Sequence, residues 1–291
     1  MPSKRFTQRQ RTLVRERAKQ DRRLERELDN DTRKYRAGIA EALRDTKDRG
    51  EQLRTVLAEG DSWFNYPLGR SITTNVDNHK NVALLNLASH GDEGKQMLGM
   101  KQHERLQKVL RAGPATKHQF NVLMFSAGGN DLLGHGALRY WVNTYEPGMT
   151  SQEMLNMRNL KHIFGIIDIV MTELFALRDA ESPKTKIYLN AYDFAPANGE
   201  GVCGLGPWLK PSLTHRKVPR RLQNEVVKLL LQKYEQRLRR HAKKSRNARV
   251  IHTQGTLTAK EWANEIHPKN SGFKKIAQPF KDALDQDFPW T

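Results

Sequence analysis

From residue 53 onward, short apolar runs alternate with longer amphipathic segments. This alternation restricts the fold classes that the chain can adopt. Five runs have the length and composition of buried strands, at 53–58, 81–88, 120–127, 186–192 and 248–253. Segments with helical periodicity separate or follow them, near 93–112, 151–180, 219–244 and 270–285. Alternating strands and helices favour a parallel sheet with helices on both faces, and continuous apolar runs suit doubly buried strands. The pattern predicts an α/β fold, a three-layer αβα sandwich around a central, mainly parallel five-stranded sheet of flavodoxin-like type.

The first 50 residues differ in composition and predict a basic helical extension. Residues 1–54 carry 17 Lys and Arg against 10 Asp and Glu, and Gly and Pro are nearly absent between Ser3 and Asp48. Strong helix formers dominate this segment, and its apolar stripe is thin. We expect one or two long helices over residues 1–50, solvated by default. Docking on the domain at 51–291, on another chain or on an anionic surface is the alternative.

Small and polar residues follow the predicted strands at the edge where a parallel sheet binds its ligands. Gly60, Asp61 and Ser62 follow the first strand, Gly91 the second and Asn130 the third, and His267 lies in the loop after the last. A neutral imidazole can take the proton of a serine hydroxyl near pH 7. Backbone N–H groups and an asparagine amide can stabilise an oxyanion. These residue types indicate acyl transfer by a serine nucleophile.

Four blocks around these residues resemble the SGNH (or GDSL) serine hydrolases, in the order found in that family. They are GDSW at 60–63, NLASHG at 86–91, GGND at 128–131 and NEIHPKNSGF at 264–273. Each block alone is a weak signal, whereas four in order, each after a predicted strand, form a specific one. The resemblance covers residues 53–285 and leaves the N-terminal 50 residues outside it.

The resemblance implies a hydrolase of carboxylic esters that needs no metal or organic cofactor. It makes Ser62 the nucleophile and His267 the general base. The oxyanion hole would consist of the Ser62 and Gly91 amides and the Asn130 side chain. The family includes esterases, lipases, thioesterases and carbohydrate deacetylases, so the expected substrate is an ester, for example of a lipid or an acetylated glycan.

One position departs from the family pattern. The family usually has an aspartate three residues before the histidine, and this chain has Asn264 there. A neutral amide can orient an imidazole but compensates its positive charge less well than a carboxylate does. Asn264, Glu265 and Asp193 are therefore all candidates for the third catalytic residue, and a Ser–His dyad assisted by a backbone carbonyl is the remaining alternative.

Aromatic residues near the four blocks are candidates for a substrate pocket, although aromatic side chains more often belong to the core. The candidates are Trp63, Phe64, Tyr192 and Trp208. The ten histidines show no metal-binding spacing such as H-E-x-x-H, so no metal site is expected.

The formal net charge of +18 favours an anionic partner such as phospholipid or an acidic glycan. Residues 210–249 contribute 14 Lys and Arg against only Glu225 and Glu235. The alternative from another functional class is a non-catalytic basic protein that uses the hydrolase fold as a scaffold for nucleic acid or an anionic membrane. Such a protein would bind with a steep dependence on salt.

Cysteine content and hydropathy give an expectation for the compartment. Cys203 is the one cysteine of the sequence, so a disulfide within the chain is impossible. No window approaches 18 apolar residues, and the N-terminal stretch lacks the apolar core of a secretory signal. We expect no transmembrane segment and a cytoplasmic protein by default, although signal-independent export would leave no such mark.

Overall fold

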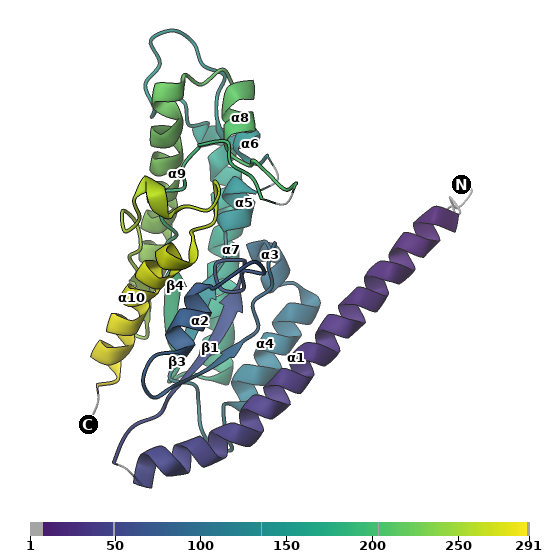
Figure 1. Cartoon of the computed structure of the whole chain (residues 1–291), viewed down its shortest axis with the longest axis vertical. Coiled ribbons are helices and arrows are strands. Elements are labelled where there is room, and N and C mark those ends of the chain that lie inside the picture. The colour runs from purple at the N-terminus through teal and green to yellow at the C-terminus, as the bar shows by residue number, and fades with distance from the viewer. Residues whose placement is uncertain (1–7, 49, 135, 203, 290–291) are drawn as a thin grey trace.

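A parallel five-stranded sheet lies at the centre of the chain (Figure 1). The computed structural model describes residues 8–48, 50–134, 136–202 and 204–289, with the backbone alone at 8–18, 20–21, 24 and 100. Cys203 therefore lies outside the described residues. The strands are β1 (Arg54–Gly60), β2 (Val82–Asn86), β3 (Val122–Ser126), β4 (Lys186–Asn190) and β5 (Ala248–Ile251). Their order is β2-β1-β3-β4-β5, and every neighbouring pair is parallel, which confirms the predicted sheet.

Long helices cover the sheet and short ones lie in the loops at its edges. The long helices are α1 (Gln8–Asp48), α4 (Met100–Ala112), α7 (Met157–Glu181), α9 (Arg220–Ala242) and α10 (Asn270–Asp287). The short ones are α2 (Ile72–Asp77), α3 (Gly94–Met97), α5 (Gly129–Leu133), α6 (Leu138–Trp141), α8 (Lys210–His215) and the 3₁₀ helix η1 (Ala259–Glu261).

The helices form two layers around the sheet, as Figure 1 shows. α2 packs against α10, and α7 packs against α3, α4 and α9. Both layers bury the central strands, whose residues are mainly apolar, although β1 also buries Arg54 and Glu59. All seven residues of β1 and all five of β3 are buried. The three-layer αβα sandwich predicted from the sequence is therefore confirmed.

The bounds of two predicted helices need correction, and the short helices were not predicted. The segment near 93–112 is divided into α3 and α4 around Gly99, and the segment near 151–180 becomes helical only at Met157. Five-residue and four-residue helices such as α5 and α6 are absent from the prediction, because so few residues carry no helical periodicity.

α1 is a continuous helix of 41 residues, and its C-terminal part docks on the domain. The Tyr35 ring stacks on Phe120 with 6.2 Å between ring centroids, and the Tyr35 hydroxyl donates to the Ala83 carbonyl of β2. The Ile39 side chain is buried. The N-terminal part of α1 projects away from the domain (Figure 1). The default expectation of a solvated extension thus describes only part of this helix.

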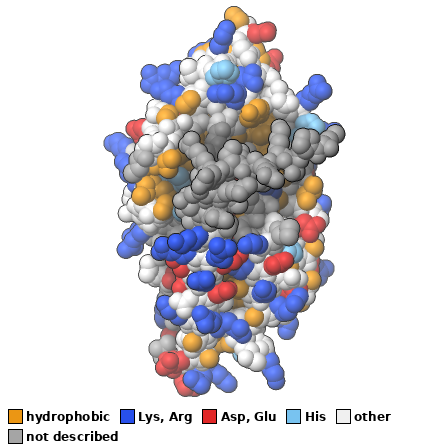
Figure 2. Space-filling view, turned by 90° about the vertical axis from the view of Figure 1, so that its right-hand side faces the viewer, with side chains coloured by type: hydrophobic (Ala, Val, Ile, Leu, Met, Phe, Trp, Pro, Cys, Tyr) orange, Lys and Arg blue, Asp and Glu red, His pale blue; other side chains and the backbone are white. Residues whose placement is uncertain are grey.

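Lysine and arginine side chains are spread over the face of the molecule shown in Figure 2, with acidic side chains among them. The C-terminal end of α9 and the turn after it carry several cations. Arg240, Lys243, Lys244 and Arg246 are all exposed there. The positive charges of these four side chains are thus exposed to solvent rather than buried in the fold.

Candidate active site

The turn after β1 exposes Ser62 at the carboxyl edge of the sheet. Gly60 is required at the end of the strand, since a Cβ added there would lie 2.8 Å from the Ser126 Cβ and carbonyl oxygen of β3. Asp61 then closes the turn. Its amide donates to the Ser126 carbonyl, and its Oδ1 accepts the Trp63 amide at 3.0 Å. Asp61 is thus a structural residue that fixes the backbone on either side of Ser62.

The Asp61 carboxyl group is buried and belongs to a polar network beneath the turn. Its Oδ2 accepts a hydrogen bond from the Tyr192 hydroxyl at 2.5 Å, and Oδ1 accepts one from the Ser126 hydroxyl at 3.2 Å. Desolvation by burial raises the pKa of Asp61 to about 7, and the hydrogen bonds oppose that rise.

The structure brings Ser62 and His267 together from segments 205 residues apart. Ser62 Oγ lies 2.7 Å from His267 Nε2, and each residue is 7% exposed. His267 lies in the loop between η1 and α10, where its carbonyl accepts the Ala263 amide. Burial lowers the pKa of His267 to about 4, so the ring is neutral near pH 7. A neutral imidazole at this distance can accept the serine proton.

Asn130 lines the same cavity as Ser62 and His267. Its Nδ2 donates to the Asp92 carbonyl at 2.8 Å, which fixes the amide and leaves its second N–H without a partner among the described residues. Gly91, with φ of 84°, precedes Asp92 but is not among the residues that line the cavity. The Ser62 and Gly91 amides donate no hydrogen bond within the described part of the chain.

None of the three candidates for the third catalytic residue is bonded to the His267 ring. Asn264 Oδ1 accepts the backbone amides of Ile266 and His267 at 3.0 and 2.9 Å. His267 Nδ1 is buried and has no hydrogen-bond partner among the described residues. Asn264 Nδ2 is also buried and also lacks a partner there. Asn264 therefore supports the loop backbone rather than the imidazole.

The two acidic alternatives hold other loops in place. Asp193 accepts the Gly255 and Leu257 amides, and burial raises its pKa. Glu265 is fully buried and accepts the Leu209 amide at 2.6 Å and the Lys210 amide at 2.9 Å. Both carboxylates thus satisfy backbone donors of neighbouring loops, and neither contacts His267 Nδ1.

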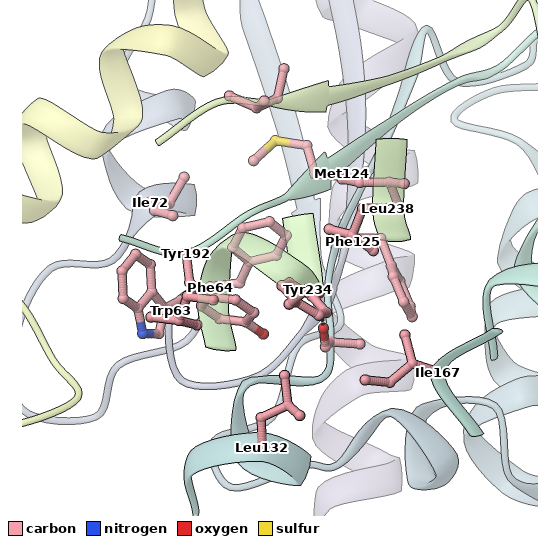
Figure 3. Packing of buried hydrophobic residues seen from close by; sticks show 14 of the residues in the cluster. Trp63, Phe64, Ile72, Met124, Phe125, Leu132, Ile167, Tyr192, Tyr234 and Leu238 are labelled. Atoms are coloured by element: carbon pink, nitrogen blue, oxygen red, sulfur yellow. Dashed lines mark hydrogen bonds between the residues drawn. The ribbon is translucent and has the colours of Figure 1, made fainter. Parts of the chain in front are cut away.

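The four aromatic pocket candidates lie in different places. Trp63 and Tyr192 line the cavity, edge to face, with 5.1 Å between ring centroids (Figure 3). Trp208 presents its ring at 88° to His267, with 6.0 Å between centroids. Phe64 is fully buried and packs edge to face on Phe280 in the core, so its assignment to the pocket is corrected.

Sequence reasoning missed several residues around the site. The Tyr66 ring lies 4.6 Å from the His267 ring, tilted by 32°. The cavity is also lined by Gly129, Leu133, Ala195 and Ile266. Tyr66 follows the GDSW block by three residues, a proximity that offered a weak signal. Leu133 and Ala195 could not be recognised as cavity residues from the sequence, because small and aliphatic residues are common in any hydrophobic core.

Within the described residues, no group of three or more His, Cys, Asp or Glu side chains is placed to hold a metal ion. Among the helices described, none combines the length and apolar character needed to cross a bilayer.

Comparisons with known proteins place the chain by its fold. No protein-family model and no curated protein matches the sequence. A candidate platelet activating factor from Streptococcus pneumonia is similar over 93% of this chain and 99% of its own, with a TM-score of 0.50 and 14% identity.

Two further similar structures have lower TM-scores. A candidate SGNH hydrolase from Slackia heliotrinireducens has a TM-score of 0.48 at 10% identity, covering 80% of this chain and 100% of its own. A family 3 carbohydrate esterase from Clostridium thermocellum has a TM-score of 0.45 at 14% identity, covering 81% and 98%. The likeness to the Streptococcus pneumonia protein shows a shared fold, which in this chain is the αβα sandwich with strand order β2-β1-β3-β4-β5.

Proposed function

We propose that this protein is a serine hydrolase that cleaves carboxylic esters through an acyl-enzyme. The observation that carries the proposal is the 2.7 Å contact between Ser62 Oγ and His267 Nε2, at the carboxyl edge of a parallel sheet. The four sequence blocks that resemble the SGNH/GDSL serine hydrolases support the same class of reaction.

Ser62 Oγ attacks the acyl carbon while His267 Nε2 takes the hydroxyl proton. The tetrahedral intermediate collapses, and the imidazolium gives this proton to the departing alcohol oxygen. A water molecule then attacks the acyl-enzyme, its proton passes to His267, and the carboxylic acid leaves as Ser62 recovers its proton.

The oxyanion of both intermediates would be stabilised by the Ser62 amide, the Gly91 amide and the free N–H of Asn130. Asn130 supports this role because one of its two N–H groups is already fixed on the Asp92 carbonyl, which limits the positions of the other. Donors fixed before the reaction need no reorganisation when charge develops.

An anionic substrate or surface is the second part of the proposal. The net charge of +18 favours an ester borne by anionic phospholipid or by an acetylated acidic glycan. If this is correct, hydrolysis should be faster on anionic than on neutral vesicles with matched acyl chains, and the difference should shrink at high salt. Equal rates of hydrolysis on both kinds of vesicle would contradict the proposal of an anionic substrate or surface.

Hydrolysis of p-nitrophenyl acetate by matched variants tests the catalytic assignment. Ser62→Ala and His267→Ala should each lower kcat/KM by about a thousandfold or more. Ser271→Ala and His118→Ala remove the same groups from exposed positions and should keep the wild-type rate. Wild-type rates in Ser62→Ala would contradict the proposal. Salt-sensitive binding to nucleic acid or membrane without ester hydrolysis would favour the non-catalytic alternative.

A further inference from the structure

The cavity beside Ser62 is very small. Its volume is about 20 Å³, and Ser62, His267 and Asn130 lie on its reactive side. One water-sized sphere needs roughly 10–15 Å³ by the same kind of measure. The enclosed space next to the nucleophile is therefore narrow and has room for one small group.

Two walls of the cavity are held by buried hydrogen bonds. The Trp63 Nε1–H donates to the Ile266 carbonyl at 3.0 Å, and the Tyr192 hydroxyl donates to Asp61 Oδ2 at 2.5 Å. Both aromatic residues are at most 5% exposed. Moving Tyr192 outward would leave the buried Asp61 Oδ2 without this donor, and moving Trp63 would break its bond to the partly buried Ile266 carbonyl.

The Tyr192 wall is also packed tightly against backbone. A Cβ added to Gly129 would lie 2.8 Å from Tyr192 Cζ, so the ring occupies the space that a side chain at residue 129 would need. Figure 3 shows Trp63 and Tyr192 side by side in the buried cluster. The ring is thus blocked on the Gly129 side as well.

Leu133 and Ala195 complete the lining with hydrocarbon alone, and they are 6% and 3% exposed. Leu133 is the last residue of α5, the short helix that also carries Asn130. Leu133 and Ile266 are large aliphatic residues of the cavity whose side chains can be shortened without removing a hydrogen bond, and Leu133 is the one on the helix that carries Asn130.

We propose that this hydrolase is selective for acetate-sized acyl groups and that Leu133 sets the limit on acyl length. The inference rests on the proposed function, because it assumes that the acyl group enters the cavity beside Ser62. Acetyl transfer to Ser62 Oγ releases the alcohol, which stays outside the cavity, and water then releases acetate. Each added methylene would enter space already filled by Leu133 or Tyr192, and overpacking of this kind is unfavourable.

The test compares p-nitrophenyl acetate, butyrate and octanoate, since these substrates share a leaving group. For the wild-type protein, kcat/KM should fall by about tenfold or more from acetate to butyrate, and further for octanoate. Leu133→Ala should raise the butyrate-to-acetate ratio by about tenfold. Leu133→Val should change the ratio in the same direction by less, which keeps the test valid if the alanine variant does not fold.

Leu229→Ala is the matched control, because Leu229 lies on α9 outside the cavity lining and should leave the ratio unchanged. Octanoate hydrolysed as fast as acetate, with Ser62-dependent rates, would overturn the acyl limit while the proposed function stands. An unchanged ratio in a folded Leu133→Ala variant would overturn the role of Leu133. Absence of any Ser62-dependent hydrolysis would overturn both proposals.

Discussion

At the scale of single residues, Asn264 is the unusual component of the site. Its amide oxygen accepts two backbone N–H groups, so the group that remains is Nδ2, which can only donate. For His267 Nε2 to accept the Ser62 proton, the ring must carry its own proton on Nδ1. Asn264 offers that proton no acceptor, and the described residues supply no other. Under the proposed mechanism the pair would therefore work as a dyad with an uncompensated imidazolium.

Asn264→Asp should increase activity. A carboxylate at this position would accept the Nδ1–H and stabilise the imidazolium, and the reverse change in a serine protease triad costs about 10⁴ in kcat. We expect kcat/KM for p-nitrophenyl acetate at pH 8 to rise by about tenfold or more. A folded variant with unchanged or lower activity would show that Asn264 acts only on the loop backbone.

The pH profile gives a separate check on the state of His267. Burial lowers its pKa to about 4, so protonation removes activity only in acid. At pH 5 about 90% of the protein should retain the neutral ring, against about 3% for an unperturbed histidine with a pKa of about 6.5. The acid limb of kcat/KM should therefore lie near pH 4.

In Asn264→Asp, the new carboxylate should raise the His267 pKa and move this limb upward by about one pH unit or more. Asp61 also titrates in this cavity and is the same in both proteins, so the difference between the two profiles reports on His267. An acid limb that lies at the same pH in both proteins would contradict the buried, uncompensated ring.

Sequence patterns predicted Ser62 and His267 but not the surroundings of the imidazole. Ser62 and Asn130 follow predicted strands directly, so strand ends alone bring them to one edge of the sheet. The hydrogen bonds of Asp193 and Glu265 depend on where distant loops such as 199–210 and 255–257 fold back. Local sequence does not contain that information.

At the scale of elements, α4 supports the oxyanion side of the site. Gln102 Nε2 donates to Asp92 Oδ2 at 2.7 Å, and the Asp92 carbonyl accepts the Asn130 amide at 2.8 Å. This chain of two hydrogen bonds links a helix on one face of the sheet to a group that would contact the oxyanion. Gln102 is therefore a positioning residue that acts through Asp92.

Gln102→Leu should lower kcat by about tenfold with little change in KM, since loss of one oxyanion donor altogether costs about 10²–10³ in kcat. Gln107→Leu removes an amide from the same helix that bonds Glu181 instead and should leave both constants unchanged. A rise in KM with constant kcat would indicate that the Asp92 loop serves substrate binding rather than the transition state.

Apolar runs and helical periodicity predicted all five strands and the long helices, because burial on both faces leaves a plain pattern in the sequence. The short helices escaped prediction, and so did the hydrogen bonds that hold the loop 193–209. Glu265 holds this loop by accepting the Gly199, Leu209 and Lys210 amides. A buried carboxylate that satisfies loop amides leaves no periodic signal.

At the scale of the whole molecule, docking of α1 extends the core beyond the αβα sandwich. Ile39 is 3% exposed, and Ile169 on α7 is 64% exposed. Ile39→Ala should lower the free energy of unfolding by about 2–5 kcal/mol. Ile169→Ala should change it by less than about 0.5 kcal/mol. Urea denaturation of the full chain measures both. Equal changes in the free energy of unfolding for the two variants would indicate that α1 is the solvated extension expected from its composition.

The central claim is that Ser62 is a nucleophile activated by His267. Reaction with a fluorophosphonate, followed by intact mass and peptide mapping, tests it most directly. We expect one phosphonyl group per chain on Ser62, no labelling in Ser62→Ala, slow labelling in His267→Ala and normal labelling in Ser271→Ala. A folded wild-type protein that stays unlabelled, or that is labelled at another residue, would contradict the claim.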